Sequence, residues 1–71
     1  MEIKEVPIKD SIKLDQFLKW AGITGTGGQS KILINDKRVK VNGKVENKRG
    51  RKILPGDIIE VEQVGKFKVT G

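Results

Sequence analysis

The sequence predicts an α+β fold in which two short helices pack on a small, mostly antiparallel β-sheet. Three observations support this prediction. The chain has 71 residues, which is enough for one small hydrophobic core. Apolar residues recur with a helical period between residues 14 and 21, a capping pattern marks a second helix from residue 27, and from residue 39 onward apolar residues alternate with polar ones as strands do. No linker or internal repeat interrupts this order, so we expect a single domain over residues 1–71.

The first helix is predicted by the spacing of its apolar residues. Leu14, Phe17, Leu18 and Ala21 fall at positions i, i+3, i+4 and i+7 of one helical face. Polar side chains take the other side, so the segment from residue 11 onward is typical of an amphipathic helix. Gly22 follows it at the position where a left-handed residue commonly ends a helix.

The second helix is predicted from a capping pattern in a glycine-rich loop. Thr26 is followed three residues later by Gln29, as in a capping box, so the helix is expected to begin at Gly27. Within this helix we expect Ile32 and Leu33 to face the core.

The first hairpin follows the second helix. Val39 and Val41 alternate with polar residues, as in a half-buried strand. Asn42-Gly43 is the strongest two-residue hairpin signal in the chain, and residues 44–46 would return from it.

A second hairpin is predicted near the end of the chain. Pro55-Gly56 indicates a turn with a positive φ at the glycine. Residues 58–64 and 66–69 would then pair about Gly65. In the first eight residues, Pro7 would confine any strand to a sheet edge or to the end of the strand.

Composition excludes several classes of function. The chain has no Cys and no His, which removes disulfides, thiolate nucleophiles, the common zinc ligands and the usual general base. We therefore expect neither an enzyme nor a bound cofactor or metal. The longest apolar run, residues 32–34, is too short to span a bilayer, and no signal peptide is evident. These features predict a cytoplasmic monomer that is not inserted in a membrane.

The charge of the chain points to a polyanionic partner. Lys and Arg number 15 against 9 Asp and Glu, giving a net charge of +6, which suits either nucleic acid or an anionic membrane surface. Eight bases lie between residues 37 and 52, where Glu46 is the one acid. Strand alternation places Arg38 and Lys40 together, opposite Val39 and Val41. A sheet face of this kind is typical of phosphate binding, although Lys on an exposed strand also protects a sheet edge.

The few aromatic residues favour structured RNA over single strands. Phe17, Trp20 and Phe67 are the aromatic residues, and no strand carries the paired rings on which bases stack. Trp20 lies off the apolar stripe, so it could cover a core edge or lie against a base; we expect the first. Recognition would then depend on the shape and charge of the RNA backbone.

The glycine-rich loop does not match a nucleotide-binding fingerprint. Gly25-Thr26-Gly27 lacks the third glycine at the required spacing, and Lys31 is not preceded by Gly as in a P-loop. A simpler possibility is left, in which exposed amides at the start of the second helix bind a phosphate.

Four segments in this order resemble the alpha-L RNA-binding motif, the domain named after small-subunit ribosomal protein S4. They are residues 13–18, the second helix ending at Ile34, residues 39–44 and residues 55–61. The match spans residues 13–61. The segments 27–31 and 47–52 also resemble a subgroup of small stand-alone bacterial proteins, and that resemblance extends over the whole chain.

The resemblance implies a non-catalytic domain that binds structured RNA, such as ribosomal RNA or a ribosome assembly intermediate, through backbone phosphates. The RNA-binding residues that it implies are Lys13, Thr26, Gly27, Gly28, Gln29, Lys31, Arg38, Lys40, Lys48, Arg49, Arg51 and Lys52. This chain departs from the family pattern twice. It has Thr26-Gly27 where Ser-Arg is common, and Lys37 where Gly is common.

Three alternatives stay open from the sequence. The basic face could bind an acidic protein, which makes a protein-interaction module the main alternative. DNA binding by a helix-turn-helix is less favoured, because the second helix offers few base-reading side chains. An enzyme is the least favoured, because no carboxylate pair, His or Cys converges in the pattern.

Overall fold

The computed structural model describes residues 3–71, which form two helices and seven strands. In chain order the elements are β1 (Ile3–Pro7), β2 (Ile12–Lys13), α1 (Leu14–Trp20), α2 (Gly27–Asn35), β3 (Val39–Val41), β4 (Lys44–Val45), β5 (Lys52–Ile53), β6 (Ile58–Val61) and β7 (Gly65–Thr70). The predicted α+β class is confirmed.

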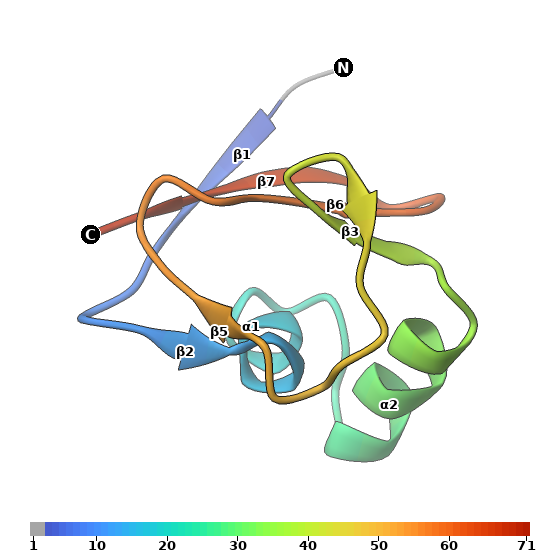
Figure 1. The fold of residues 1–71 in the computed structure, drawn as a ribbon. Helices are drawn as coiled ribbons and strands as arrows, with labels where there is room; N and C mark the ends of the chain where they lie inside the picture. The colour runs from blue at the N-terminus through green and yellow to red at the C-terminus, as the bar shows by residue number, and fades with distance from the viewer. Residues whose placement is uncertain (1–2) are drawn as a thin grey trace.

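The main sheet has five strands in the order β1-β7-β6-β3-β4. Every neighbouring pair is antiparallel except β1 and β7, which run parallel. Because β1 stands first in this order, it is an edge strand. It ends at Pro7, and both features agree with the prediction from the sequence. A separate ladder of two residue pairs joins β2 to β5 beneath the sheet, on the side where both helices lie (Figure 1).

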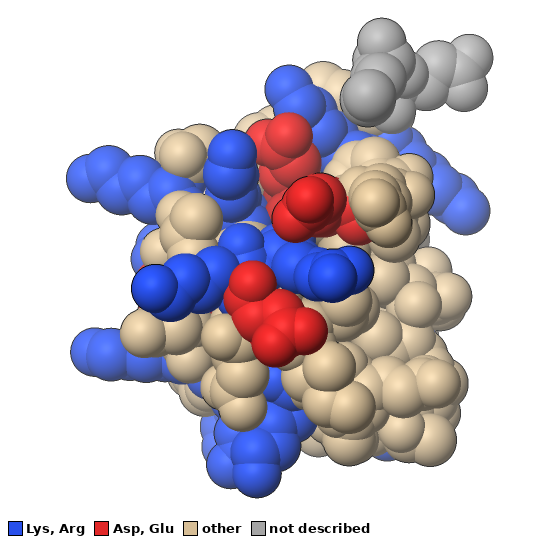
Figure 2. Space-filling view, turned by 90° about the vertical axis from the view of Figure 1, so that its right-hand side faces the viewer, with Lys and Arg blue, Asp and Glu red and all other residues tan. Residues whose placement is uncertain are grey.

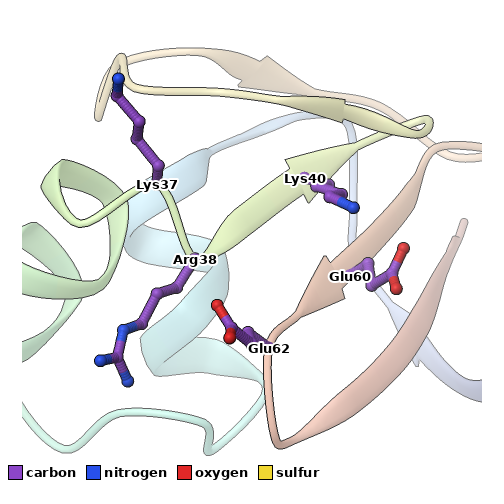
Figure 3. A pocket seen from close by; sticks show the side chains of 5 residues that line it. All are labelled: Lys37, Arg38, Lys40, Glu60 and Glu62. Atoms are coloured by element: carbon purple, nitrogen blue, oxygen red, sulfur yellow. The ribbon is translucent and has the colours of Figure 1, made fainter.

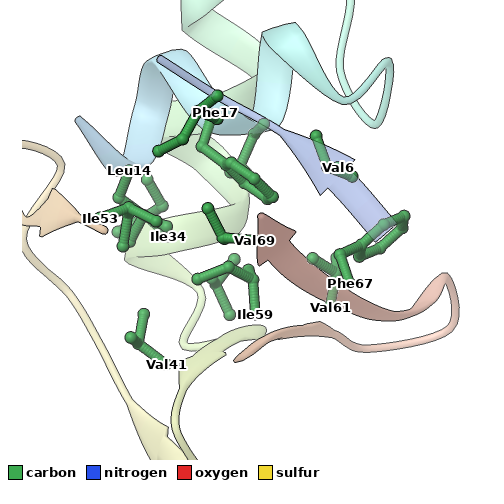
Figure 4. Packing of buried hydrophobic residues seen from close by; sticks show 13 residues of the cluster. Val6, Leu14, Phe17, Ile34, Val41, Ile53, Ile59, Val61, Phe67 and Val69 are labelled. Carbon is green, nitrogen blue, oxygen red and sulfur yellow. The ribbon is translucent and has the colours of Figure 1, made fainter. Parts of the chain in front are cut away.

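The core lies between the main sheet and the two helices (Figure 4). Strand alternation sends Val39, Val41, Ile59 and Val61 to one face, where the register places Val39 against Val61 and Val41 against Ile59. The helices supply buried residues from the other side: Leu14, Phe17, Leu18 and Ile34. Ile53 reaches the same core from β5. This packing fixes which side chains of β3 and α1 face solvent.

α1 begins at Leu14, three residues later than the sequence suggested, because residues 12–13 pair with β5 instead. Its end is as predicted. Gly22 has a φ of 76°, and its amide donates to the carbonyl of Lys19 at 3.0 Å. The amide of Ile23 donates to Leu18 at 3.0 Å. These two bonds form a Schellman motif.

α2 ends in the same motif, with Lys37 in the left-handed position that Gly22 takes after α1. Lys37 has a φ of 61°, and its amide donates to Ile34 at 3.1 Å. The amide of Arg38 donates to Leu33 at 3.1 Å. Replacing the family's usual glycine with Lys37 therefore leaves the geometry of this turn intact.

The predicted inward face of α2 was wrong in part. Ile32 is 60% exposed, Leu33 is partly buried, and the fully buried residues are Ser30 and Ile34. Ser30 can lie inside because its hydroxyl shares a hydrogen bond of 2.6 Å with the buried hydroxyl of Thr24. Because Ser30 is polar, the apolar residues of α2 alone do not show which side of the helix faces the core.

Trp20 also differs from expectation, since it does not cover the core. It is 63% exposed at the end of α1. The buried face of α1 is made by Leu14, Phe17 and Leu18. The Trp20 side chain lies outside this face.

The first hairpin is as predicted. Asn42 and Gly43 have φ angles of 53° and 86°, as a two-residue type I′ turn requires. The Asn42 side chain also accepts a bond from the amide of Ile58 at 2.9 Å, which ties the turn to β6.

The second hairpin is shorter than predicted. Gly56 has the expected positive φ of 100°. However, β6 ends at Val61, and residues 62–64 form the turn, with Gln63 at a φ of 67°. Gly65 lies in β7 opposite Val61.

Candidate nucleic-acid interface

Two lysines that are far apart in the sequence face each other on the short ladder. The register of β2 and β5 pairs Lys13 with Lys52, and both side chains are exposed. Like charges directly opposite on neighbouring strands destabilise a ladder. An anion placed between the two ammonium groups would relieve this repulsion.

The segment before β5 is fastened to the start of α1. The amide of Leu14 donates to the carbonyl of Arg51 at 2.8 Å, and the amide of Asp15 donates to Arg49 at 3.2 Å. These carbonyls occupy two amides of the first helical turn, so those amides are not available to a phosphate. The bonds also bring the basic segment beside Lys13. We call the exposed bases Lys13, Lys48, Arg49 and Lys52 the loop face.

Glu46 holds the basic segment in shape. One carboxylate oxygen accepts a bond from the amide of Lys48 at 3.2 Å, and the other accepts a bond from the Arg51 guanidinium at 3.0 Å. The Glu46 side chain is 15% exposed, and that of Arg51 is 38% exposed. Arg51 was predicted to bind RNA, yet in this structure its charge is compensated by an ion pair.

The outer face of β3 is less basic than its sequence suggested. Arg38 and Lys40 are exposed, as predicted. However, the register places Lys40 opposite Glu60, which in turn lies opposite Lys66. Glu62 is joined to Arg38 through a backbone bond of 2.9 Å.

Glu60 and Glu62 line a hollow together with Lys37, Arg38 and Lys40 (Figure 3). Figure 2 shows acidic side chains among basic ones in the middle of one face of the molecule. Counting charge between residues 37 and 52 missed Glu60 and Glu62, because they come from β6 and the turn that follows it.

The start of α2 is capped as predicted. Thr26 Oγ1 accepts a bond from the amide of Gln29 at 3.2 Å, and the Gln29 side chain accepts one from the amide of Gly25 at 2.8 Å. Gly27 and Gly28 are not among the glycines with positive φ. A Cβ atom at Gly27 would meet nothing within 4 Å, and one at Gly28 would meet Thr26 Oγ1 at 3.8 Å. Backbone geometry and packing therefore do not require glycine at either position.

Thr26, Gln29 and Lys31 are exposed beside these glycines. The predicted site residues thus fall into three groups: the loop face with Arg51, the outer face of β3, and the start of α2 from Thr26 to Lys31. The β2–β5 ladder could not be predicted, because a strand of two residues is too short to show a period. In the sequence, Glu46 was considered only as a charge opposing the neighbouring bases. Its position two residues before Lys48 was the feature that could have indicated its bond to the Lys48 amide.

Within residues 3–71 no cluster of three or more acidic, His or Cys side chains is placed to hold a metal ion. The two described helices are both too short to cross a bilayer.

A protein-family model described as the S4 domain matches residues 6–70. The chain belongs to the S4 domain family. The match covers more than the 13–61 core recognised from the sequence, and it confirms the resemblance. As an S4 domain, the chain is a non-catalytic RNA-binding domain.

The relatives of this S4 domain include ribosomal proteins. It is 42% identical over 61 residues to the "Probable ribosome maturation protein RlbA" of Bacillus subtilis (strain 168), covering 86% of each chain. It is 35% identical over 57 residues to small ribosomal subunit protein uS4 of Kosmotoga olearia, covering 80% of this chain but 27% of that protein.

A solved structure supports the same fold. This S4 domain matches the solution structure of YbcJ from E. coli, which reveals an alpha-L motif involved in RNA binding. The TM-score is 0.73 at 26% identity, and the match covers all of this chain and 91% of the other. The predicted alpha-L architecture is therefore confirmed.

Proposed function

We propose that this S4 domain binds ribosomal RNA or a ribosome assembly intermediate through its backbone phosphates, with the loop face as the main contact. The observation that carries the proposal is the pairing of Lys13 with Lys52 on the β2–β5 ladder. The segment that carries the exposed bases Lys48 and Arg49 is bonded to the start of α1, which brings further positive charge to this region. The relative named as a ribosome maturation protein, which matches this chain over 86% of both lengths, supports a ribosomal RNA.

The loop face is preferred over the outer face of β3 on electrostatic grounds. Lys40 lies opposite Glu60, so part of its field is cancelled before any RNA arrives. Lys13 lies opposite another base, so a phosphate there both gains attraction and removes repulsion. Arg38 and Lys40 would then make a weaker, secondary contact.

The first turn of α2 is proposed as a further phosphate contact. The first amides of a helix lack partners within the helix. Gly27 and Gly28 leave that turn without side chains, and Lys31 adds charge one turn later. Thr26 and Gln29 would hold the turn in place through their capping bonds.

A comparison of two double variants tests the main contact. Lys13→Gln/Lys52→Gln and Arg38→Gln/Lys40→Gln each remove two positive charges from exposed positions, so they match in net charge. Binding to a fragment of ribosomal RNA is measured at several salt concentrations. The first variant should lose more affinity, and its log–log salt slope should fall by about two units, roughly one per lost phosphate contact.

Two outcomes would contradict parts of the proposal. Equal losses in both variants would mean that only total charge matters and that the loop face is not the site. Wild-type protein that binds no RNA at low salt would instead favour an acidic protein partner. Crosslinking in cells followed by sequencing of the bound RNA then identifies whether the RNA is ribosomal.

A further inference from the structure

Trp20 is a large aromatic side chain that the fold leaves in solvent. It is 63% exposed at the end of α1. Its indole Nε1 donates a hydrogen bond of 2.8 Å to the carbonyl of Pro7 in β1. This bond satisfies the polar edge of the ring and fixes its position, while most of the ring surface stays free.

The position of Trp20 on α1 relates it to the loop face. Lys13 lies just before the first residue of α1, and Trp20 is the last residue of this helix. Gln16 and Trp20, four residues apart, follow one side of the helix, and all three side chains are exposed. The helical rise from Lys13 to Trp20 is about 10 Å, a length that one RNA strand readily covers.

The two ends of α1 suit different parts of a nucleotide. Lys13 and Lys52 at the start of α1 present two ammonium groups for phosphate. The end of a helix carries a partial negative charge, which disfavours a phosphate but not a neutral base. An exposed indole offers a face on which any base can stack, without a requirement for one sequence.

We propose that Trp20 is a stacking platform for an unpaired nucleobase of the RNA whose phosphates lie at the loop face. This inference rests on the proposed RNA-binding function and adds to it a preference for RNA with an unpaired base next to a structured region. It also gives the exposed tryptophan a role, since the core does not use this ring.

The chain provides its own probe for this contact, because Trp20 is its one tryptophan. Two RNA probes of equal length are compared, a ribosomal RNA hairpin with an unpaired loop and an uninterrupted duplex. Stacking should quench the emission of Trp20 on adding the hairpin, with little change on adding the duplex. Both titrations are carried out at low salt, where phosphate contacts hold either RNA.

Variants separate stacking from loss of an exposed apolar side chain. Trp20→Leu should weaken hairpin binding roughly 5- to 150-fold, the range expected for one base–aromatic stack, and should leave duplex binding unchanged. Trp20→Phe should restore most of the affinity, because it keeps a ring. Ile32→Ala is the matched control, since Ile32 is 60% exposed on the other helix.

The outcomes distinguish this proposal from the function on which it rests. Hairpin binding with unchanged emission, together with a Trp20→Leu affinity equal to wild type, would overturn the stacking platform and leave the loop face in place. An equal loss of duplex and hairpin binding in Trp20→Leu would also overturn it. If neither RNA binds the wild-type protein at low salt, the proposed function itself fails.

Discussion

Gly27 and Gly28 occupy a helical turn in which alanine would fit. Neither residue has a positive φ, and an added Cβ would be accommodated at both positions. Gly27→Ala and Gly28→Ala should therefore keep or raise stability, by up to about 1 kcal/mol each. If a phosphate approaches this backbone, the same changes should weaken RNA binding by crowding it. Thermal melts beside binding curves check both statements, and variants that bind RNA as the wild type does would remove this turn from the site.

Lys37 is held in a conformation that disfavours any side chain. Its φ of 61° lies in the left-handed region, where a residue with a Cβ is strained by about 1 kcal/mol or more relative to glycine. Lys37→Gly should raise the melting temperature by several degrees, since about 1 kcal/mol shifts a domain of this size by roughly 4–8 °C.

Lys37→Ala is the control for that change, because it removes the charge and keeps the Cβ. An equal loss of RNA affinity in both variants would assign the charge of Lys37 to RNA binding. A melting temperature that falls in Lys37→Gly would show that flexibility in the unfolded chain outweighs the relief of strain.

The basic segment between β4 and β5 depends on Glu46 for its shape. Glu46→Gln raises the net charge by one, so attraction alone predicts tighter RNA binding. The variant also weakens the bonds to Lys48 and Arg51, which should loosen the loop face. We expect weaker RNA binding and a stability loss of about 0.2–1 kcal/mol, the range for a partly exposed ion pair.

Glu62→Gln is the matched control for Glu46→Gln, since it makes the same change in charge at an exposed acid in the turn after β6. It should keep RNA affinity or raise it. Tighter RNA binding in both variants would mean that Glu46 acts only through its charge. Hydrogen exchange of the Lys48 amide provides a second measurement and should speed up in Glu46→Gln alone.

Elements with a clear period, a capping pair or a turn signal were predictable from the sequence. Contacts between distant segments were not. The capping pair Thr26 and Gln29 and the turn Asn42-Gly43 carry local signals, and both were placed correctly. The ladder of Lys13 with Lys52 and the neighbour Glu60 of Lys40 depend on chain pairing. The sequence therefore indicated which residues are basic, whereas the fold determines which of those charges are compensated.

The stability of the whole molecule depends on a small core. Val39 is fully buried, and its register partner Val61 is nearly so. Val39→Asp should unfold the domain, because an unpaired buried charge costs more than a domain of this size can lose. Arg38→Gln/Lys40→Gln should stay folded, within about 0.5 kcal/mol for each surface change. Circular dichroism during heating distinguishes the two, and loss of fold in the double Gln variant would contradict the described strand faces.

Because β1 pairs in parallel with β7, the main sheet cannot be completed until the last strand of the chain has been synthesised. β7 lies between β1 and β6 in the sheet, so the first strand has no partner until residues 65–70 have been synthesised. Joining segments so distant in sequence requires closing a long loop before any contact compensates for its entropy, which slows folding. A chain truncated before Gly65 would retain both helix segments and nearly all of its basic residues, yet it would lack Phe67 and Val69 from the core. Such a fragment would attract RNA as a charged, unfolded polymer, without the shape that gives recognition its selectivity.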